Sequence, residues 1–162
     1  MHQDQETLDL PALRQHWLSH TSHAYGHDHA SRLLPAESVA EAQSRLDWMA
    51  ALLDFLRLGE DLPASALPDV RPHLKLAQVL GAWLEAADLL QLREVLERLG
   101  DYRQALMRAE TDNPLRALGQ NLSAPPGLLE KLRQGLDDEG QIRDDASPEL
   151  GRVRRQMHGA RR

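Results

Sequence analysis

The apolar residues of this chain recur mainly at the spacing of an α-helix. The clearest pattern begins at Ser38, which forms an S-x-x-E capping box with Glu41. Apolar residues then follow at alternating intervals of three and four: Val39, Ala42, Leu46, Met49, Leu53 and Leu56. This spacing is typical of the a and d positions of packed helices, so we predict a helix that stops near Gly59 and assign its stripe to the core.

Three bulky residues, Trp48, Leu52 and Phe55, lie beside this stripe. The alternative to a core role is that these three residues form a surplus apolar face, which would serve as a dimer surface. The longest pattern covers residues 84–110, where Leu89, Leu92, Leu96 and Leu99 share one face. On its solvent side we expect two i,i+4 ion pairs, Arg93–Glu97 and Glu94–Arg98.

Shorter helices are predicted from capping residues and prolines. Three of them have a capping residue: Asp9 precedes a helix over Ala12–Ser19, Asp69 precedes one that runs to about Leu80, and Asn113 precedes one from Pro114 to near Gly119. Two more are predicted from the polar patch 19–29 toward Leu34 and from Gly127 to Gln134. Residues 60–68 carry two prolines and are predicted to form a loop. Asp138-Glu139-Gly140 suggests a tight turn, and a small β-hairpin over 136–143 is the one β element considered.

The C-terminal stretch contains a strong helix start. Ser147 is a good N-cap, Pro148 suits the first helical position, and Glu149 adds negative charge there. Leu150, Val153 and Met157 then share one face, and only Gly159 resembles a stop signal. We therefore expect a lever-type helix and interpret the chain as a segment of something larger.

The fold class that follows is all-α, an irregular array of about six to seven helices. We treat residues 1–162 as a single helical domain, the N-terminal part of the core of a larger protein. Within it, residues 1–34 hold short helices, 35–135 the main body, and 136–162 the hairpin and the start of the lever helix.

Composition narrows the class of function. Apolar residues make up 41% of the chain and aromatic residues 4%, so the core is built from Leu and Ala. The formal charge of −6 disfavours a protein that grips nucleic acid over its whole surface. Cysteine is absent, and neither a signal peptide nor a membrane span is visible, so we expect a cytoplasmic protein without a membrane partner. Neither Lys75 nor Lys131 follows glycine, which excludes a P-loop within this chain.

Histidines are concentrated near the N-terminus. The cluster comprises His16, His20, His23, His27 and His29, with Asp28. The first four would share one face of a continuous helix and could chelate zinc. Gly26 interrupts that helix, and no cysteine, H-E-x-x-H motif or carboxylate at ligand spacing completes the set, so we interpret these residues as solvated and assign no metal site.

Two charged groups flank the C-terminal helix. The basic group comprises Arg152, Arg154, Arg155, Arg161 and Arg162. These arginines are candidate contacts to nucleic-acid phosphate or to an acidic partner. The alternative is that they form a solvated helix face, because the helix dipole favours cations near a C-terminus. The acidic group, Asp137, Asp138, Asp144 and Asp145, lacks the EF-hand pattern, and we expect Asp144 and Asp145 to cap backbone or form an Asx turn.

Residues 138–155 carry a family resemblance. Their sequence, D-E-G-Q-I-R-D-D-A-S-P-E-L-G-R-V-R-R, resembles the pattern D-G-x-I-x-D-x-A-S-P-x-L-x-x-(I/V)-R-R of the second MutS subfamily. This branch lacks mismatch-reading N-terminal domains and often ends in a small Smr nuclease domain. Residues 67–74 (L-P-D-V-R-P-H-L) and Thr7-Leu8 are similar to weaker family segments, and order and spacing agree over essentially the whole chain. The histidine patch replaces the usual S-x-x-G-K segment, and residues 77–84 are shortened.

The resemblance implies the first half of a helical core, ahead of a clamp and an ATPase. It implies a full-length homodimer that uses ATP and Mg²⁺, binds branched DNA, and acts as an endonuclease suppressing homologous recombination. In some bacteria the family also senses and splits collided ribosomes. No catalytic or cofactor-binding residue carries over to this segment, because none of the catalytic motifs lies here.

Three hypotheses remain. The first is a non-catalytic core segment that couples the ATPase to a nucleic-acid clamp. The second is a free-standing helical adaptor for protein–protein interaction. The third is a metal-dependent enzyme that uses the histidine cluster.

Overall fold

The all-α prediction is confirmed. The computed structural model describes residues 9–63 and 66–160, and these form eight helices. The helices are α2 Leu10–Ser19, α3 Ala24–Arg32, α4 Val39–Arg57, α5 Arg71–Ala77, α6 Ala86–Leu106, α7 Pro114–Asn121, α8 Leu128–Gly135 and α9 Pro148–Ala160. Thr7-Leu8, part of the family resemblance, lies outside the described residues. Within the described ranges, no helix combines the length and apolar character needed to cross a bilayer.

Local capping explains where several helices begin. The Ser38 side chain accepts a hydrogen bond from the Glu41 N–H at 3.1 Å, and Asn113 accepts one from the Leu115 N–H at 2.9 Å. In a capping box the Glu41 carboxylate would accept a hydrogen bond from the Ser38 N–H. Here it accepts instead from the N–H of the preceding residue, Glu37, at 2.9 Å. Asp9 occupies the N-cap of α2 but makes no capping side-chain hydrogen bond.

The buried core is small and lies where α4, α6 and α7 meet. Phe55, Leu106, Ala109 and Leu115 form it, and Phe55 is only 2% exposed. Gly119 lets α7 approach α6 closely, because a Cβ at this position would lie 2.9 Å from the Leu106 Cβ. Gly119 therefore sits inside α7 as a packing residue, and the helix predicted to end near Gly119 ends at Asn121.

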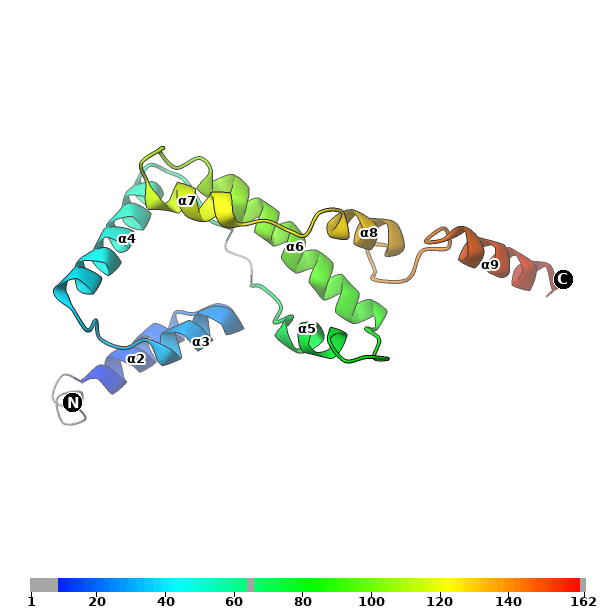
Figure 1. Ribbon diagram of the computed structural model, residues 1–162, viewed down its shortest axis with the longest axis horizontal. Helices are drawn as coiled ribbons and strands as arrows, with labels where there is room; N and C mark the ends of the chain where they lie inside the picture. The colour runs from blue at the N-terminus through cyan, green and yellow to red at the C-terminus, as the bar shows by residue number, and fades with distance from the viewer. Residues whose placement is uncertain (1–8, 64–65, 161–162) are drawn as a thin grey trace.

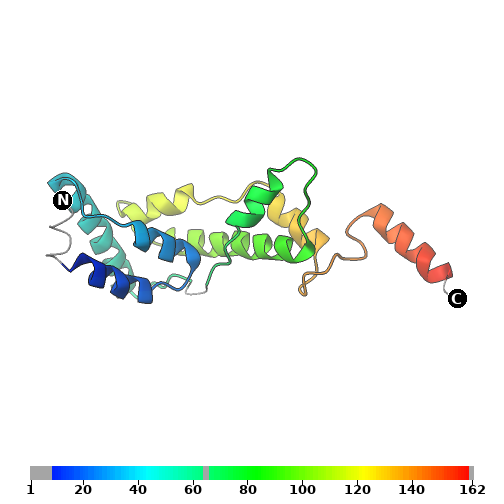
Figure 2. The same cartoon turned by 90° about the horizontal axis from the view of Figure 1, so that it is seen from below.

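The remaining helices extend outward from α6. In both views α2 and α3 pair near one end of the molecule, α5 and α8 flank α6, and α9 projects at the opposite end (Figures 1 and 2). The exposed surface is 12475 Å². A compact protein of 18.2 kDa would expose about 8,100 Å². The fold is consequently open, with many apolar side chains facing solvent.

The assignment of faces on α4 was wrong. The predicted core stripe faces solvent, with Val39 87%, Leu46 62% and Leu53 44% exposed. Phe55 and Leu52, which we considered for a dimer surface, instead pack in the core, while Trp48 stays exposed. The reason is tertiary: α7 contacts α4, and it lies on the Phe55 side.

The β-hairpin predicted over 136–143 is not formed. Leu136 and Ile142 make an isolated antiparallel bridge, and no strand occurs within residues 9–63 and 66–160. Helix α8 continues to Gly135, so only Leu136 and Asp137 remain between this helix and the turn. Two-stranded hairpins are marginal even when longer, which explains why the pairing stops at a single bridge.

Candidate functional site

The best-built polar region of the C-terminal half is a joint that connects α6 to α9. We define the joint as Arg93 together with the turn 136–142. The Arg93 guanidinium donates to the backbone carbonyls of Asp137 at 2.9 Å and Leu136 at 3.4 Å. The Arg93 side chain is only 11% exposed, so α6 holds the turn through a largely buried cation.

This geometry corrects the predicted ion pairs on α6. Arg93 does not pair with Glu97 on the solvent side; Glu97 instead receives a hydrogen bond from Arg133 of α8 at 2.9 Å. Arg98 pairs with Asp101 at 3.8 Å rather than with Glu94. The prediction followed sequence spacing within one helix, whereas the approach of α8 and the turn determines the actual partners.

Gly140 gives the joint a second point of contact. Its φ of +76° is a left-handed conformation that favours glycine. A Cβ on Gly140 would also lie 2.6 Å from Leu90 Cδ2, so the turn approaches α6 closely. The turn is closed by Asp137, whose N–H donates to the Gln141 carbonyl at 2.9 Å and whose side chain accepts from the Gln141 N–H at 2.7 Å.

The start of α9 is as predicted. Ser147 accepts a hydrogen bond from the Leu150 N–H at 3.1 Å, and Pro148 is the first helical residue. Neither Asp144 nor Asp145 caps α9, although the Asp145 carboxylate accepts a hydrogen bond from its own backbone N–H. Asp144 pairs with Arg154, and Asp145 receives a hydrogen bond from Arg143 at 3.1 Å, which lowers the pKa of Asp145. The two carboxylates thus each bind an arginine side chain next to the turn, Asp144 binding Arg154 and Asp145 binding Arg143.

The candidate basic residues occupy different environments. Arg154 also donates to the Ile142 carbonyl at 3.4 Å, so it ties α9 to the joint. Arg152 and Arg155 are exposed, and within the described ranges neither forms an ion pair. Arg161 and Arg162 lie outside the described residues. Of the candidate arginines within residues 9–160, Arg152 and Arg155 are therefore the two that can contact an external anion.

An open pocket of about 460 Å³ lies beside these arginines, but its lining is mixed. Asp144 and Asp145 line it together with Gly151, Arg154 and Arg155. The aspartates offset the arginine charge at the pocket itself. Arg152, which does not line the pocket, is therefore better placed than Arg155 to contact an external phosphate.

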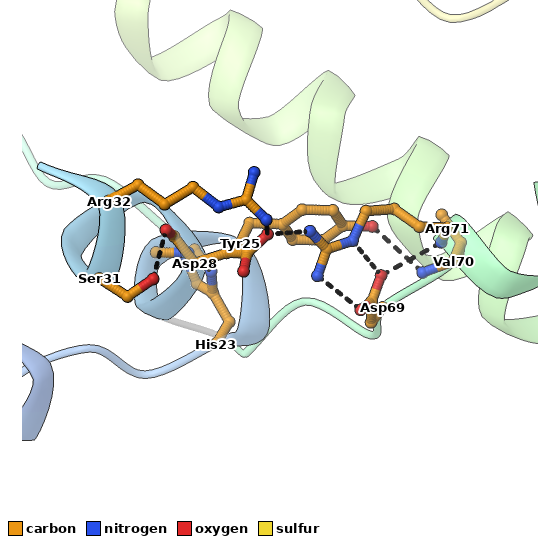
Figure 3. Close-up of polar contacts among 9 residues, drawn as sticks. His23, Tyr25, Asp28, Ser31, Arg32, Asp69, Val70 and Arg71 are labelled. Atoms are coloured by element: carbon orange, nitrogen blue, oxygen red, sulfur yellow. Dashed lines mark hydrogen bonds and ion pairs between the residues drawn. The ribbon is translucent and has the colours of Figure 1, made fainter.

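A second polar cluster, the α3–α5 latch, ties the N-terminal helices to α5 (Figure 3). We define it as Tyr25, Asp28, Asp69 and Arg71. Arg71 contacts the Asp28 carboxylate at 2.6 Å and the Asp69 carboxylate at 2.7 Å, and its guanidinium lies 4.9 Å from the centre of the Tyr25 ring. The Tyr25 hydroxyl accepts from the Val70 N–H at 3.1 Å.

The electrostatics of the latch follow from Arg71. Its hydrogen bonds lower the pKa of Asp69 to about 2 and also lower the pKa of Asp28. Asp69 does not occupy the N-cap of α5, which is Val70, although it accepts a hydrogen bond from the Arg71 N–H at 3.1 Å. Sequence reasoning missed this cluster, because Asp28 and Arg71 are 43 residues apart.

The histidine patch does not form one continuous face. Helix α2 ends at Ser19 and α3 begins at Ala24. His23 is the N-cap of α3, and its Nδ1 accepts from the Gly26 N–H at 3.1 Å. His16 and His20 make an edge-to-face contact with ring centres 4.7 Å apart. In the part of the chain that the structure describes, no three potential ligands converge on a metal position.

Comparisons with known proteins show which proteins the chain resembles. No protein-family model matches the chain. It is 30% identical to endonuclease MutS2 of Enterococcus faecalis over 93% of the chain, and 28% identical to that of Shouchella clausii over 97%. Endonuclease MutS2 of Symbiobacterium thermophilum is 29% identical over 93% of the chain. The chain spans about one fifth of the length of these curated relatives.

The chain is therefore an all-helical segment related to MutS-type proteins. Nearly the whole chain is similar in sequence to MutS2 endonucleases, which confirms the resemblance drawn from residues 138–155. The similarity is consistent with a segment from the N-terminal part of such a protein.

Proposed function

We propose that this chain is the non-catalytic helical core segment of a longer MutS2-type protein and that it couples an ATPase to a nucleic-acid clamp. The longer protein would be a cytoplasmic homodimer with ATPase and endonuclease activities that uses ATP and Mg²⁺. Its candidate substrates are branched DNA, in suppression of homologous recombination, and collided ribosomes. The domain division into residues 1–34, 35–135 and 136–162 belongs to the same proposal.

The joint is the observation that carries this proposal. Arg93 and Gly140 hold the turn against α6, and Arg154 holds the same turn against α9. A displacement of α6 would thus reach α9 through the hydrogen bonds that Arg93 and Arg154 donate to the backbone of the turn. Packed elements with such connections transmit rigid-body motion in many switching proteins.

The coding sequence beyond Arg162 tests the proposal directly. We expect it to contain the P-loop pattern G-x-x-x-x-G-K-(S/T), which this chain lacks. A stop codon immediately after Arg162 would contradict the proposal.

The isolated chain provides a second test. We expect it to hydrolyse no ATP and to bind linear duplex DNA weakly at physiological salt, because its formal charge is −6. Reproducible turnover in a pure preparation, or tight duplex binding that resists added salt, would contradict a purely coupling role.

The exposed apolar stripe of α4 favours the second candidate function, a free-standing helical adaptor. An adaptor would use this stripe to bind a separate protein and would need no downstream ATPase. Absence of a P-loop beyond Arg162, together with a stable complex between this chain and another protein, would favour the adaptor.

A further inference from the structure

The outward face of α4 is an uncovered helix-packing surface. We call it the α4 stripe and define it by the six residues at alternating spacings of three and four: Val39, Ala42, Leu46, Met49, Leu53 and Leu56. All but Ala42 are exposed, although large apolar side chains normally lie inside a protein. The stripe is therefore a continuous apolar seam along a helix of 19 residues.

The seam is separate from the surface that α4 already uses. Phe55 and Leu52 face the core formed with α6 and α7. Residue positions on a helix advance by about 100° each, which places the middle of the stripe on roughly the opposite side of α4 from Phe55. One helix thus has two apolar faces, and only one of them is occupied in this segment.

The spacing of the stripe indicates what would cover it. Apolar residues repeating every 3.5 positions leave holes that accept the side chains of another helix with the same repeat. A helix that matches all 19 residues would extend about 28 Å along α4. An irregular loop or a strand does not have this period.

The charges along the stripe favour an apolar partner over a charged one. Arg45 pairs with Glu41 at 2.5 Å, and Arg57 pairs with Asp54 at 3.2 Å, both within α4. Gln43 donates to Asp47 at 2.8 Å on the same helix. Because these flanking groups have partners within α4, the surface presents no uniform charge to attract a nucleic acid or an acidic peptide.

The similarity to longer proteins indicates where that helix comes from. The relatives are about five times as long as this chain, since it covers 20% of their length. The exposed surface exceeds that of a compact protein of the same mass, as described above. Additional polypeptide from the same protein would be held near α4 by covalent connection, at a high effective concentration.

We propose that the α4 stripe is the docking surface for an amphipathic helix supplied by the remaining part of the longer MutS2-type polypeptide. This inference rests on the proposed function and names the partner of the core segment. The docked helix places its own apolar residues between Leu46, Met49 and Leu53. Docking covers the second apolar face of α4 and fixes the orientation of α4 relative to the rest of the protein.

Cysteine reactivity tests the proposal, because the 162-residue chain has no cysteine. Leu53→Cys is prepared in the chain alone and in the longer protein expressed from the gene continued beyond Arg162, with any other cysteines there replaced by serine. We expect maleimide labelling at position 53 to be at least about tenfold slower in the longer protein, because a docked helix excludes the reagent.

Ser44→Cys is the matched control. Ser44 is exposed on the same helix but lies outside the stripe, so its labelling rate should be similar in both proteins. A second variant, Leu46→Glu/Leu53→Glu, should leave the melting temperature of the chain alone nearly unchanged and lower that of the longer protein. Thermal unfolding measures both effects.

Other outcomes overturn the proposal in distinguishable ways. A longer protein that contains a P-loop but labels at position 53 as rapidly as the chain alone would refute docking and leave the proposed function standing. Sedimentation of the chain alone as a dimer, with position 53 already protected, would identify a second copy as the occupant. A gene that ends at Arg162 would remove the proposed function and the docking partner together.

Discussion

Single residues determine how closely the C-terminal turn approaches α6. Gly140 combines a left-handed backbone with a position where any side chain would meet Leu90. Arg93 supplies the hydrogen bonds that hold the turn in this position. The tight turn was predictable from the D-E-G sequence, whereas its contact with α6 was not, because no local pattern links residue 140 to residue 90.

Gly140→Ala should lower the free energy of unfolding more than Gly59→Ala. Gly59 has a similar φ of +83° but no heavy atom within 4 Å of an added Cβ. We expect a loss of about 1–2 kcal/mol at Gly59 from backbone conformation alone. At Gly140, displacement of Leu90 should add roughly 1–3 kcal/mol. Urea denaturation measures both values, and equal losses would contradict the close approach.

The α3–α5 latch should contribute stability that depends on pH. The pKa of Asp69 is about 2 in the folded protein, below its usual 3.8, because Arg71 donates hydrogen bonds to its carboxylate. A lowered pKa stabilises the folded state above pH 3.8, and this contribution is lost as the pH falls from about 4 to 2.

Asp69→Asn should therefore reduce the dependence of unfolding free energy on pH within this acidic window. Asp112→Asn is the control, since it makes the same change in charge at an exposed side chain. Chemical denaturation at a series of pH values provides the measurement. An unchanged acid dependence in Asp69→Asn would show that the latch does not form in solution.

At the scale of helices, the residue at which a helix begins was more predictable from the sequence than the side of the helix that is buried. Ser38, Asn113 and Ser147 accept backbone N–H groups two or three residues ahead, so local sequence suffices to place these caps. The buried side of α4 depends on where α7 packs, and α7 begins more than fifty residues later. The periodicity of α4 correctly predicted a helix, but it could not identify which of two apolar faces this segment covers.

Arg93→Met should loosen α9 relative to α6. Spin labels at Gln104→Cys and Gln156→Cys, both exposed positions on these helices, report the distance between them. We expect a broader distance distribution in Arg93→Met, because the two carbonyls at the turn lose their common donor. Arg98→Met should leave the distribution unchanged, since Arg98 contacts only Asp101 of its own helix among the ion pairs described. Equal distributions in all three proteins would show that Arg93 does not hold the joint.

At the scale of the whole molecule, the small core and the large exposed surface are consistent with a scaffold. Core residues gather at one end of α6, while the joint and α9 lie toward the other (Figure 1). The candidate contacts Arg152 and Arg155 are on α9, at the far end of this arrangement. Sequence patterns indicated the all-helical class and the family, but the open shape depends on how helices pack and was not anticipated.

The most direct test of the coupling role is nucleic-acid-stimulated ATP hydrolysis by the longer MutS2-type protein. We expect Arg93→Met to leave basal hydrolysis unchanged and to abolish most of the stimulation, because the joint no longer transmits motion between α6 and α9. Arg98→Met should retain both activities. Full stimulation in Arg93→Met would contradict the account.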